Sequence, residues 1–214
     1  MDHAESLRIL KRDLRFAPLI KKYGPPQLIQ RGQKARLKVF DALLRSIIYQ
    51  QLSGKAAATI LGRFKTIFNP TSPRATKGTQ KFPTPAQVSI MSVEKLRSAG
   101  LSQAKALYIK DLAEKFESGV IKHRSFSRME SQAIIEHLLQ IKGVGVWTVH
   151  MLLIFTLGRP NVLPTGDLGV RKGMQRVYKL KSLPTPSEME RLAKSWREHA
   201  SIAAWYLWRV ADEK

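Results

Sequence analysis

The sequence predicts an all-α protein, and three observations support this fold class. Apolar residues recur three and four positions apart through most of the chain, which places them on one side of a helix. No segment alternates apolar and polar residues over the length of a half-buried strand. Ser, Asp and Gly stand at the edges of the periodic segments, where helices commonly begin and end. Helices packed around a shared core are therefore expected.

The first periodic segment covers residues 37–68 and predicts two helices. The letters QQLSG interrupt its pattern at residues 50–54. Residues 69–85 are rich in Pro, Thr and Lys and predict a loop. The expected core-facing residues are Val39, Leu43, Leu44 and Ile47 in the first helix and Ala57, Ile60, Leu61 and Phe64 in the second.

The rest of the chain predicts further helices with start and stop signals. A short helix ends near Gly100, and a longer one begins at Ser102. Another leads into the letters KGVGV, and the helix that follows them stops at Gly158. Asp167 opens the next helix, and two helices close the chain.

A chain of 214 residues can form one large domain or two small lobes. We expect residues 37–160 to surround one core. Residues 1–36 and 161–214 would then form the second lobe, with a groove between the two.

The charge balance is strongly basic. Lys and Arg number 37 against 16 Asp and Glu, which gives a net charge of +21 and an isoelectric point near 10.5. A folded domain with this excess repels itself, so the charge indicates a polyanionic partner, most often nucleic acid. A merely solubilising basic surface is the alternative. No apolar run is long enough to span a bilayer, so no membrane role is expected, and the absence of cysteine excludes disulfides and Cys-ligated metal centres.

A glycine hairpin, Gly143-Val144-Gly145, joins two of the expected helices. Glycine permits a tight turn of the backbone and leaves the amides at the start of the next helix uncovered. Such a helix N-terminus is a ready site for a phosphate group. A plain connection between helices is the alternative, and the basic composition favours phosphate.

Five spaced segments give this hairpin a context. They are RSIIYQQLSGKAAATI, FPTP, GLSQAKALYIKDLA, QIKGVGVWTVHML followed by LPTGDLGVRKG, and SWREHASIAAWYLWR, and they span about residues 37–210. The set resembles the helix-hairpin-helix (HhH-GPD) DNA glycosylases, in the 3-methyladenine branch and its short fungal-type form. The resemblance implies one all-α, two-lobed glycosylase domain over residues 1–214, with damaged double-stranded DNA bound across the groove. It further implies base flipping, monofunctional cleavage of the N-glycosidic bond in base excision repair, a monomer without a required cofactor and, in a eukaryote, a nuclear location.

Asp167 is the candidate catalytic residue. It is the only acidic residue between Glu136 and Glu188 and lies in a basic stretch, where it could simply cap a helix. The resemblance implies catalysis, and one carboxylate can fill both roles. Breaking a deoxyribose–base bond builds positive charge on the sugar. An ionised carboxylate stabilises that charge and orients or activates water, so we expect Asp167 to be charged at neutral pH.

The resemblance assigns roles to four further residues. Gln51 matches the residue that fills the gap left by the flipped base, and Ser53 lies beside it on the minor-groove wedge. A polar helix cap is the alternative for Gln51. Residues 42–93 contain seven Lys or Arg and no acid, which makes Lys55 a candidate phosphate contact, with a solvated lysine as the alternative. Trp147 and Trp208 match aromatic residues of the base pocket, whose faces would attract a cationic alkylated base. Tryptophans at helical spacing can equally be core residues.

The hairpin carries two further implications. Lys142 and the amides of Gly143, Val144 and Gly145 are expected to hold the DNA backbone. The carbonyls of Lys142 or Gly143 and of Gly145 are expected to bind a sodium or potassium ion when DNA is present. Trp147 stands where bifunctional relatives carry a Schiff-base lysine, so lyase chemistry by that route is not expected.

The sequence departs from the family pattern at a few positions. Gly166 stands where relatives often carry a second acid, Ser53 is smaller than in some members, and Met151 and residues 198–200 also differ. Three hypotheses therefore stay open. The chain is an active alkylpurine glycosylase, a catalytically weak or inactive homologue that binds abasic sites or damaged DNA, or a basic helical RNA-binding or structural protein.

Overall fold

The computed structural model describes residues 2–28, 38–69 and 81–213. Every regular element within these ranges is helical, which confirms the predicted all-α class. Residues 70–80, most of the predicted loop, lie outside the described residues, as does Leu37 at the start of the first predicted helix.

The chain divides into two compact units. Leu37–Val149 forms one, here called the central unit, and Met1–Arg36 with His150–Lys214 forms the other, here called the split unit. The sequence placed the later boundary near residue 160, whereas it falls inside one continuous helix, α9 (Val146–Phe155). The helical spacing of apolar residues does not show where along a helix one unit ends and the next begins.

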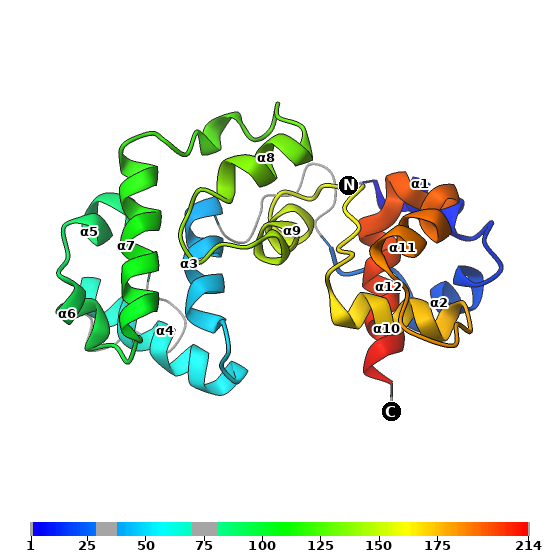
Figure 1. Ribbon diagram of the computed structural model, residues 1–214, viewed down its shortest axis with the longest axis horizontal. Helices are drawn as coiled ribbons and strands as arrows, with labels where there is room; N and C mark the ends of the chain where they lie inside the picture. The colour runs from blue at the N-terminus through cyan, green and yellow to red at the C-terminus, as the bar shows by residue number, and fades with distance from the viewer. Residues whose placement is uncertain (1, 29–37, 70–80, 214) are drawn as a thin grey trace. The chain divides into compact units, whose positions relative to one another are not determined.

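The central unit is organised around one long helix. Its elements are α3 (Val39–Tyr49), α4 (Gly54–Phe68), α5 (Pro85–Ser89), α6 (Val93–Arg97), α7 (Gln103–Glu117), the 3-10 turn η1 (His123–Ser125), α8 (Ser131–Leu138) and the start of α9. Helix α7 packs against α3, α5 and α6, as Figure 1 shows. Leu43, Leu44 and Ile47 of the predicted stripe are fully buried in this core, together with Ile109 and Leu112 of α7.

Local signals set the helix boundaries of the central unit. Ser102 caps α7, because its side-chain oxygen accepts a hydrogen bond from the Lys105 amide at 3.2 Å, as the sequence predicted. Thr84 opens α5 with a capping box. Sequence analysis missed α5, because its five residues follow directly on the Pro- and Thr-rich segment that predicted a loop.

The split unit is organised around α12. Its elements are α1 (His3–Leu10), α2 (Phe16–Tyr23), the end of α9, α10 (Leu168–Val177), α11 (Pro186–Ala193), the 3-10 segment η2 (Lys194–His199) and α12 (Ala200–Asp212). Helix α12 packs against α1, α2, α10 and η2. Burial also raises the pKa of Tyr206 to about 12, and its hydroxyl donates to the Gly24 carbonyl at 2.8 Å.

Helices α10 and α12 approach each other closely in the split unit. A Cβ atom at Gly173 would lie 2.2 Å from the carbonyl oxygen of Leu207, which is backbone and cannot rotate away. Only glycine therefore lets the two helices meet at this distance. Because α10 begins directly after Asp167, this contact also sets where that carboxylate lies.

Replacing Gly173 with Ala is expected to destabilise the protein, by about 1–3 kcal/mol, because the added methyl group overpacks the α10–α12 contact. Thermal unfolding followed by circular dichroism measures the effect. Gly62→Ala is the matched control, since Gly62 is also helical and has no neighbouring atom within 4 Å of its Cβ position. That change is expected to raise stability by up to about 1 kcal/mol through helix propensity. Equal shifts for both variants would contradict the close-contact argument.

Candidate functional site

The hairpin between α8 and α9 depends on one of its two glycines. Gly143 has φ +77°, in the left-handed region, and a Cβ atom there would lie 2.2 Å from the ring of Tyr108 on α7. Gly145 has no atom within 4 Å of its Cβ position. The turn therefore requires glycine at Gly143, whereas Gly145 leaves open space where a ligand backbone can approach.

Hydrogen bonds within the hairpin decide which backbone groups face outward. The Val144 amide donates to the Ile141 carbonyl at 3.1 Å, so Val144 points its N–H inward, and its side chain is buried. The Val149 amide donates to the Gly145 carbonyl at 3.1 Å as the first hydrogen bond of α9. The hairpin leads directly into α9, and the N-terminus of a helix suits a phosphate group, which makes this helix end a better phosphate site than Val144.

The loop of residues 50–53 lies against the hairpin. The side-chain amide of Gln50 donates to the Gly143 carbonyl at 2.8 Å. Gln51 is exposed and has φ +55°, which is uncommon for a residue other than glycine. Ser53 caps α4 by accepting from the Ala56 amide at 3.3 Å, and the exposed Lys55 lies in the first turn of α4. The structure thus brings this loop, here called the wedge loop, together with the hairpin.

Asp167 is a buried acidic residue at the start of α10, with only 8% of the residue exposed. Its Oδ1 atom accepts two hydrogen bonds, from the Val170 amide at 2.9 Å and from the indole nitrogen of Trp208 at 2.8 Å. The first bond is a helix cap, so the capping role considered from the sequence is present. The second bond comes from α12 and fixes the carboxylate from a different helix.

Trp208 is held from two sides within the split unit. Its ring stacks on Phe155, the last residue of α9, with ring centroids 5.6 Å apart and an angle of 26° between the planes. A Cβ atom at Gly169 would lie 2.8 Å from the Trp208 ring and 3.1 Å from Oδ1 of Asp167, so only glycine leaves room there. Sequence analysis missed both Phe155 and Gly169. Two glycines four apart in one helix, here Gly169 and Gly173, were the available signal for close packing.

The predicted site residues fall into two groups. Asp167 and Trp208 meet in the split unit. The hairpin, the wedge loop and Trp147 belong to the central unit, and Trp147 is 51% exposed, so it is not a core residue.

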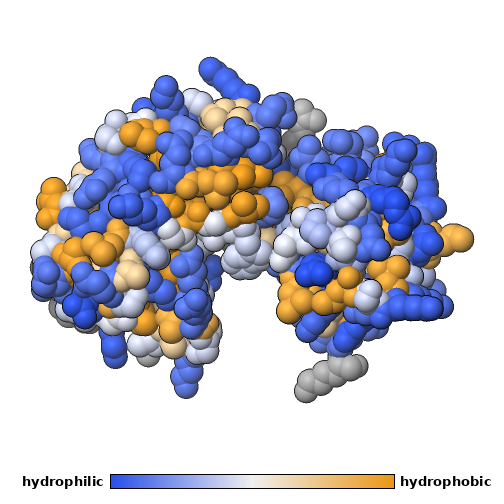
Figure 2. Space-filling view, in the orientation of Figure 1, coloured by the Kyte–Doolittle hydropathy of each residue, from blue (hydrophilic) through white to orange (hydrophobic). Residues whose placement is uncertain are grey.

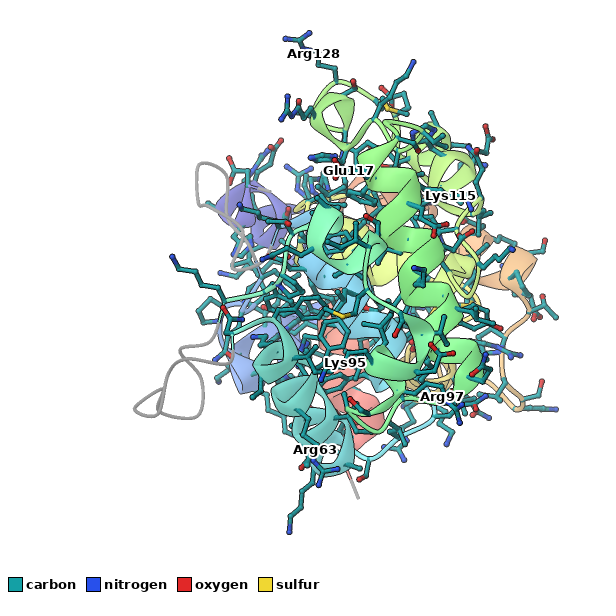
Figure 3. The ribbon with its side chains drawn as sticks, turned by 90° about the vertical axis from the view of Figure 1, so that its left-hand side faces the viewer. Arg63, Lys95, Arg97, Lys115, Glu117 and Arg128 are labelled. Atoms are coloured by element: carbon teal, nitrogen blue, oxygen red, sulfur yellow. The ribbon has the colours of Figure 1, made fainter. Side chains whose placement is uncertain are left out.

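Basic side chains are exposed on the central unit. Arg63 of α4 and Lys95 and Arg97 of α6 lie on one face of it, where Figure 3 labels them. Hydrophilic residues cover much of the visible surface of each unit in Figure 2. A surface of this charge attracts a polyanion without regard to its sequence.

Neither a metal-binding cluster nor a membrane-spanning helix occurs among the described residues. Within residues 2–28, 38–69 and 81–213, no group of three or more His, Asp and Glu side chains is arranged to hold a metal ion. No helix in the described part of the chain has both the length and the apolar character needed to cross a membrane.

Comparison with known proteins gives a consistent set of relatives. Residues 44–198 match the family model of the HhH-GPD superfamily base excision DNA repair protein. The chain is 34% identical over 198 residues to DNA-3-methyladenine glycosylase 1 of Schizosaccharomyces pombe, covering 92% of this chain and 81% of that protein. It is 33% identical over 199 residues to the alkylbase DNA glycosidase-like protein mag2 of the same yeast, covering 92% and 88%. The solved structure of the S. pombe 3-methyladenine DNA glycosylase in complex with abasic DNA matches with a TM-score of 0.74 and 33% identity, over 95% of this chain and 94% of that one.

Proposed function

Because the chain belongs to the HhH-GPD superfamily of base excision DNA repair proteins, we propose that it is a monofunctional DNA glycosylase acting on alkylated purines. It flips a damaged base of the 3-methyladenine or 7-methylguanine type out of double-stranded DNA and hydrolyses its N-glycosidic bond. The observation that carries the proposal is the buried Asp167 carboxylate, fixed by two hydrogen bonds to one of its oxygens.

Asp167 supplies the chemistry in this mechanism. As the bond between deoxyribose and base breaks, the sugar gains positive charge, and the Asp167 carboxylate stabilises it. The same carboxylate orients the water that attacks the sugar. An alkylated purine already carries positive charge and leaves readily, so no separate strong acid is needed. The hydrogen bond from Trp208 keeps the carboxylate from rotating away during these steps.

The central unit supplies the grip on DNA in this proposal. The amides at the start of α9 bind a backbone phosphate, and Lys142 and Lys55 add charge near it. Gln51 enters the gap left by the flipped base, with Ser53 beside it. The exposed face of Trp147 is available to stack on a base.

The hairpin is also proposed to bind sodium or potassium when DNA is bound. Backbone carbonyl oxygens of Lys142, Gly143 and Gly145 suit a hard cation. Two of them already accept one hydrogen bond each, Gly143 from Gln50 and Gly145 from Val149. A carbonyl has two lone pairs, so each retains capacity for a cation.

The decisive test is base release from methylated duplex DNA by the purified protein, with binding to abasic-site DNA measured on the same samples. We expect release of methylated purines and tight binding of the abasic product. A protein that binds abasic DNA but releases no base would instead support the second candidate, a binding homologue without excision activity. Gly166 favours that candidate, because it provides no second acid although its Cβ position has no atom within 4 Å.

Replacing Trp208 with Phe tests the hydrogen bond to Asp167. The ring can still stack on Phe155, but the N–H donor is gone. Loss of one hydrogen bond to a charged group corresponds to a fall in single-turnover release of roughly tenfold or more. Release at the unmutated rate would show that the indole nitrogen does not position the carboxylate.

The proposed setting of the protein follows its proposed substrate. We expect a monomer that binds one duplex, located in the nucleus of a eukaryotic cell or otherwise in the cytoplasm with the chromosome. Fluorescence microscopy of the tagged protein and light scattering of its complex with DNA test these two points.

A further inference from the structure

Helix α7 makes contact with both DNA-gripping parts of the central unit. Lys105, Tyr108 and Asp111 lie three residues apart along it, and side chains at this spacing are neighbours on a helix surface. Lys105 contacts the wedge loop, whereas Tyr108 and Asp111 contact the hairpin. One rigid helix thus supports both parts.

Lys105 holds the backbone where α3 ends. Its ammonium group donates to the carbonyl oxygens of Ile48 at 2.8 Å and of Gln50 at 2.6 Å. Carbonyls in the last turn of a helix lack intrahelical partners, and a cation at that end is favourable. Burial lowers the pKa of Lys105 from its ordinary value, as expected for an ammonium group taken partly out of water.

Lys105 holds the backbone of Gln50, and this backbone sets the direction in which the Gln51 side chain points. Gln51 follows Gln50 directly and has φ +55°, a conformation that persists only where the flanking structure enforces it. Lys105 fixes the residue before it, and the Ser53 cap fixes the chain after it. The exposed Gln51 is therefore presented on a backbone anchored at both ends.

The same helix fixes the hairpin. The Asp111 carboxylate accepts from the Lys142 amide at 2.9 Å and pairs with Lys115 at 2.5 Å. The ring of Tyr108 packs against Gly143 so closely that a Cβ atom would not fit. The hydrogen bond from Gln50 to the Gly143 carbonyl connects the wedge loop directly to the hairpin. Lys105, the wedge loop and the hairpin are therefore linked by a continuous set of contacts.

We propose that Lys105 is a positioning residue for base extrusion. It holds the wedge loop so that Gln51 enters the duplex at a fixed place relative to the phosphate held by the hairpin. Lys105 acts through Gln50 and Gln51 and does not take part in bond cleavage. This inference rests on the proposed glycosylase function.

The chain offers a matched control on the same helix. Lys110 is also half-buried, and its ammonium group donates to two carbonyls at the end of α5, those of Ser89 at 2.8 Å and Met91 at 2.9 Å. Lys105→Met and Lys110→Met each remove one positive charge and one pair of hydrogen bonds. The two variants differ in which backbone they release.

The experiment compares both variants with the unmutated protein. Single-turnover release from DNA with a paired methylated purine is expected to fall roughly tenfold in Lys105→Met and to stay within about twofold in Lys110→Met. The Lys105→Met defect is expected to shrink when the methylated base faces a mismatch, because a mispaired base is easier to extrude. Affinity for abasic-site DNA, where no base needs extruding, is expected to fall less than the release rate.

Each outcome has a consequence. The inference would be overturned by equal effects of the two variants on release, or by a Lys105→Met defect that a mismatch leaves unchanged. In both cases base release by the unmutated protein would still support the proposed glycosylase function. If the unmutated protein binds abasic DNA but releases no base, the proposed function fails. The inference is then tested with DNA that contains 2-aminopurine, a base whose fluorescence rises when it leaves the duplex stack. An equal reduction of that rise in Lys105→Met and Lys110→Met would overturn the inference. Absence of both release and abasic binding would overturn both.

Discussion

Replacing Asp167 with Asn is expected to lower the rate of base release about 100- to 1,000-fold, because in the proposed mechanism the substitution removes the negative charge that stabilises the cationic sugar. Asn retains an oxygen that can accept from the Val170 amide and from the Trp208 indole, so both hydrogen bonds at Oδ1 can persist. Asn is also as good a helix cap as Asp. The structure of the split unit is therefore expected to remain, and with it the binding of abasic DNA.

Asp167→Ala separates chemistry from structure in the same assay. This variant loses the charge, the cap of α10 and the acceptor for Trp208. It is expected to unfold more easily, by about 1 kcal/mol for the cap alone, and to release base no faster than Asp167→Asn. Single-turnover release and thermal unfolding are measured on both. Full release by Asp167→Asn would show that the chemistry does not depend on this carboxylate.

The features that sequence analysis predicted are those that local signals encode. The spacing of Leu43, Leu44 and Ile47 reports a buried helix face, and Ser102 reports where α7 begins, because caps and stripes depend only on residues close in sequence. Asp167 could be singled out for a similar reason. It is an isolated acid in a basic stretch, although the same isolation suited a simple cap.

The features that sequence analysis missed depend on contacts between distant segments. The hydrogen bond from Gln50 to Gly143 joins residues 93 apart in the chain, and that from Lys105 to Gln50 joins residues 55 apart. Nothing in the local pattern around Lys105 distinguishes it from a solvated helical lysine. The Trp208–Asp167 bond likewise requires Gly169. Its spacing from Gly173 signals close packing, but the sequence does not show that Trp208 is the side chain packed there.

Replacing Gly143 with Ala is expected to have the second large effect, on the hairpin and on DNA binding. The new methyl group overlaps the ring of Tyr108, and the left-handed backbone disfavours any side chain. Strain and overlap together correspond to about 2–5 kcal/mol of lost stability if they add. The hairpin relieves part of the overlap by shifting, which moves the first turn of α9 away from the position proposed to bind a phosphate. Affinity for abasic-site DNA and thermal unfolding both measure the change.

Two further variants assign that effect to its cause. Gly119→Ala also places a methyl group on a left-handed residue, with φ +76°, but no atom lies within 4 Å of its Cβ position. It is expected to destabilise by backbone strain alone, about 1–2 kcal/mol, and to leave DNA affinity unchanged. Adding Tyr108→Ala to Gly143→Ala removes the overlapping ring, so the double variant is expected to be less destabilised than the sum of the two single changes. Strictly additive effects would mean that Tyr108 does not shape the hairpin, and that left-handed strain alone makes Gly143 necessary.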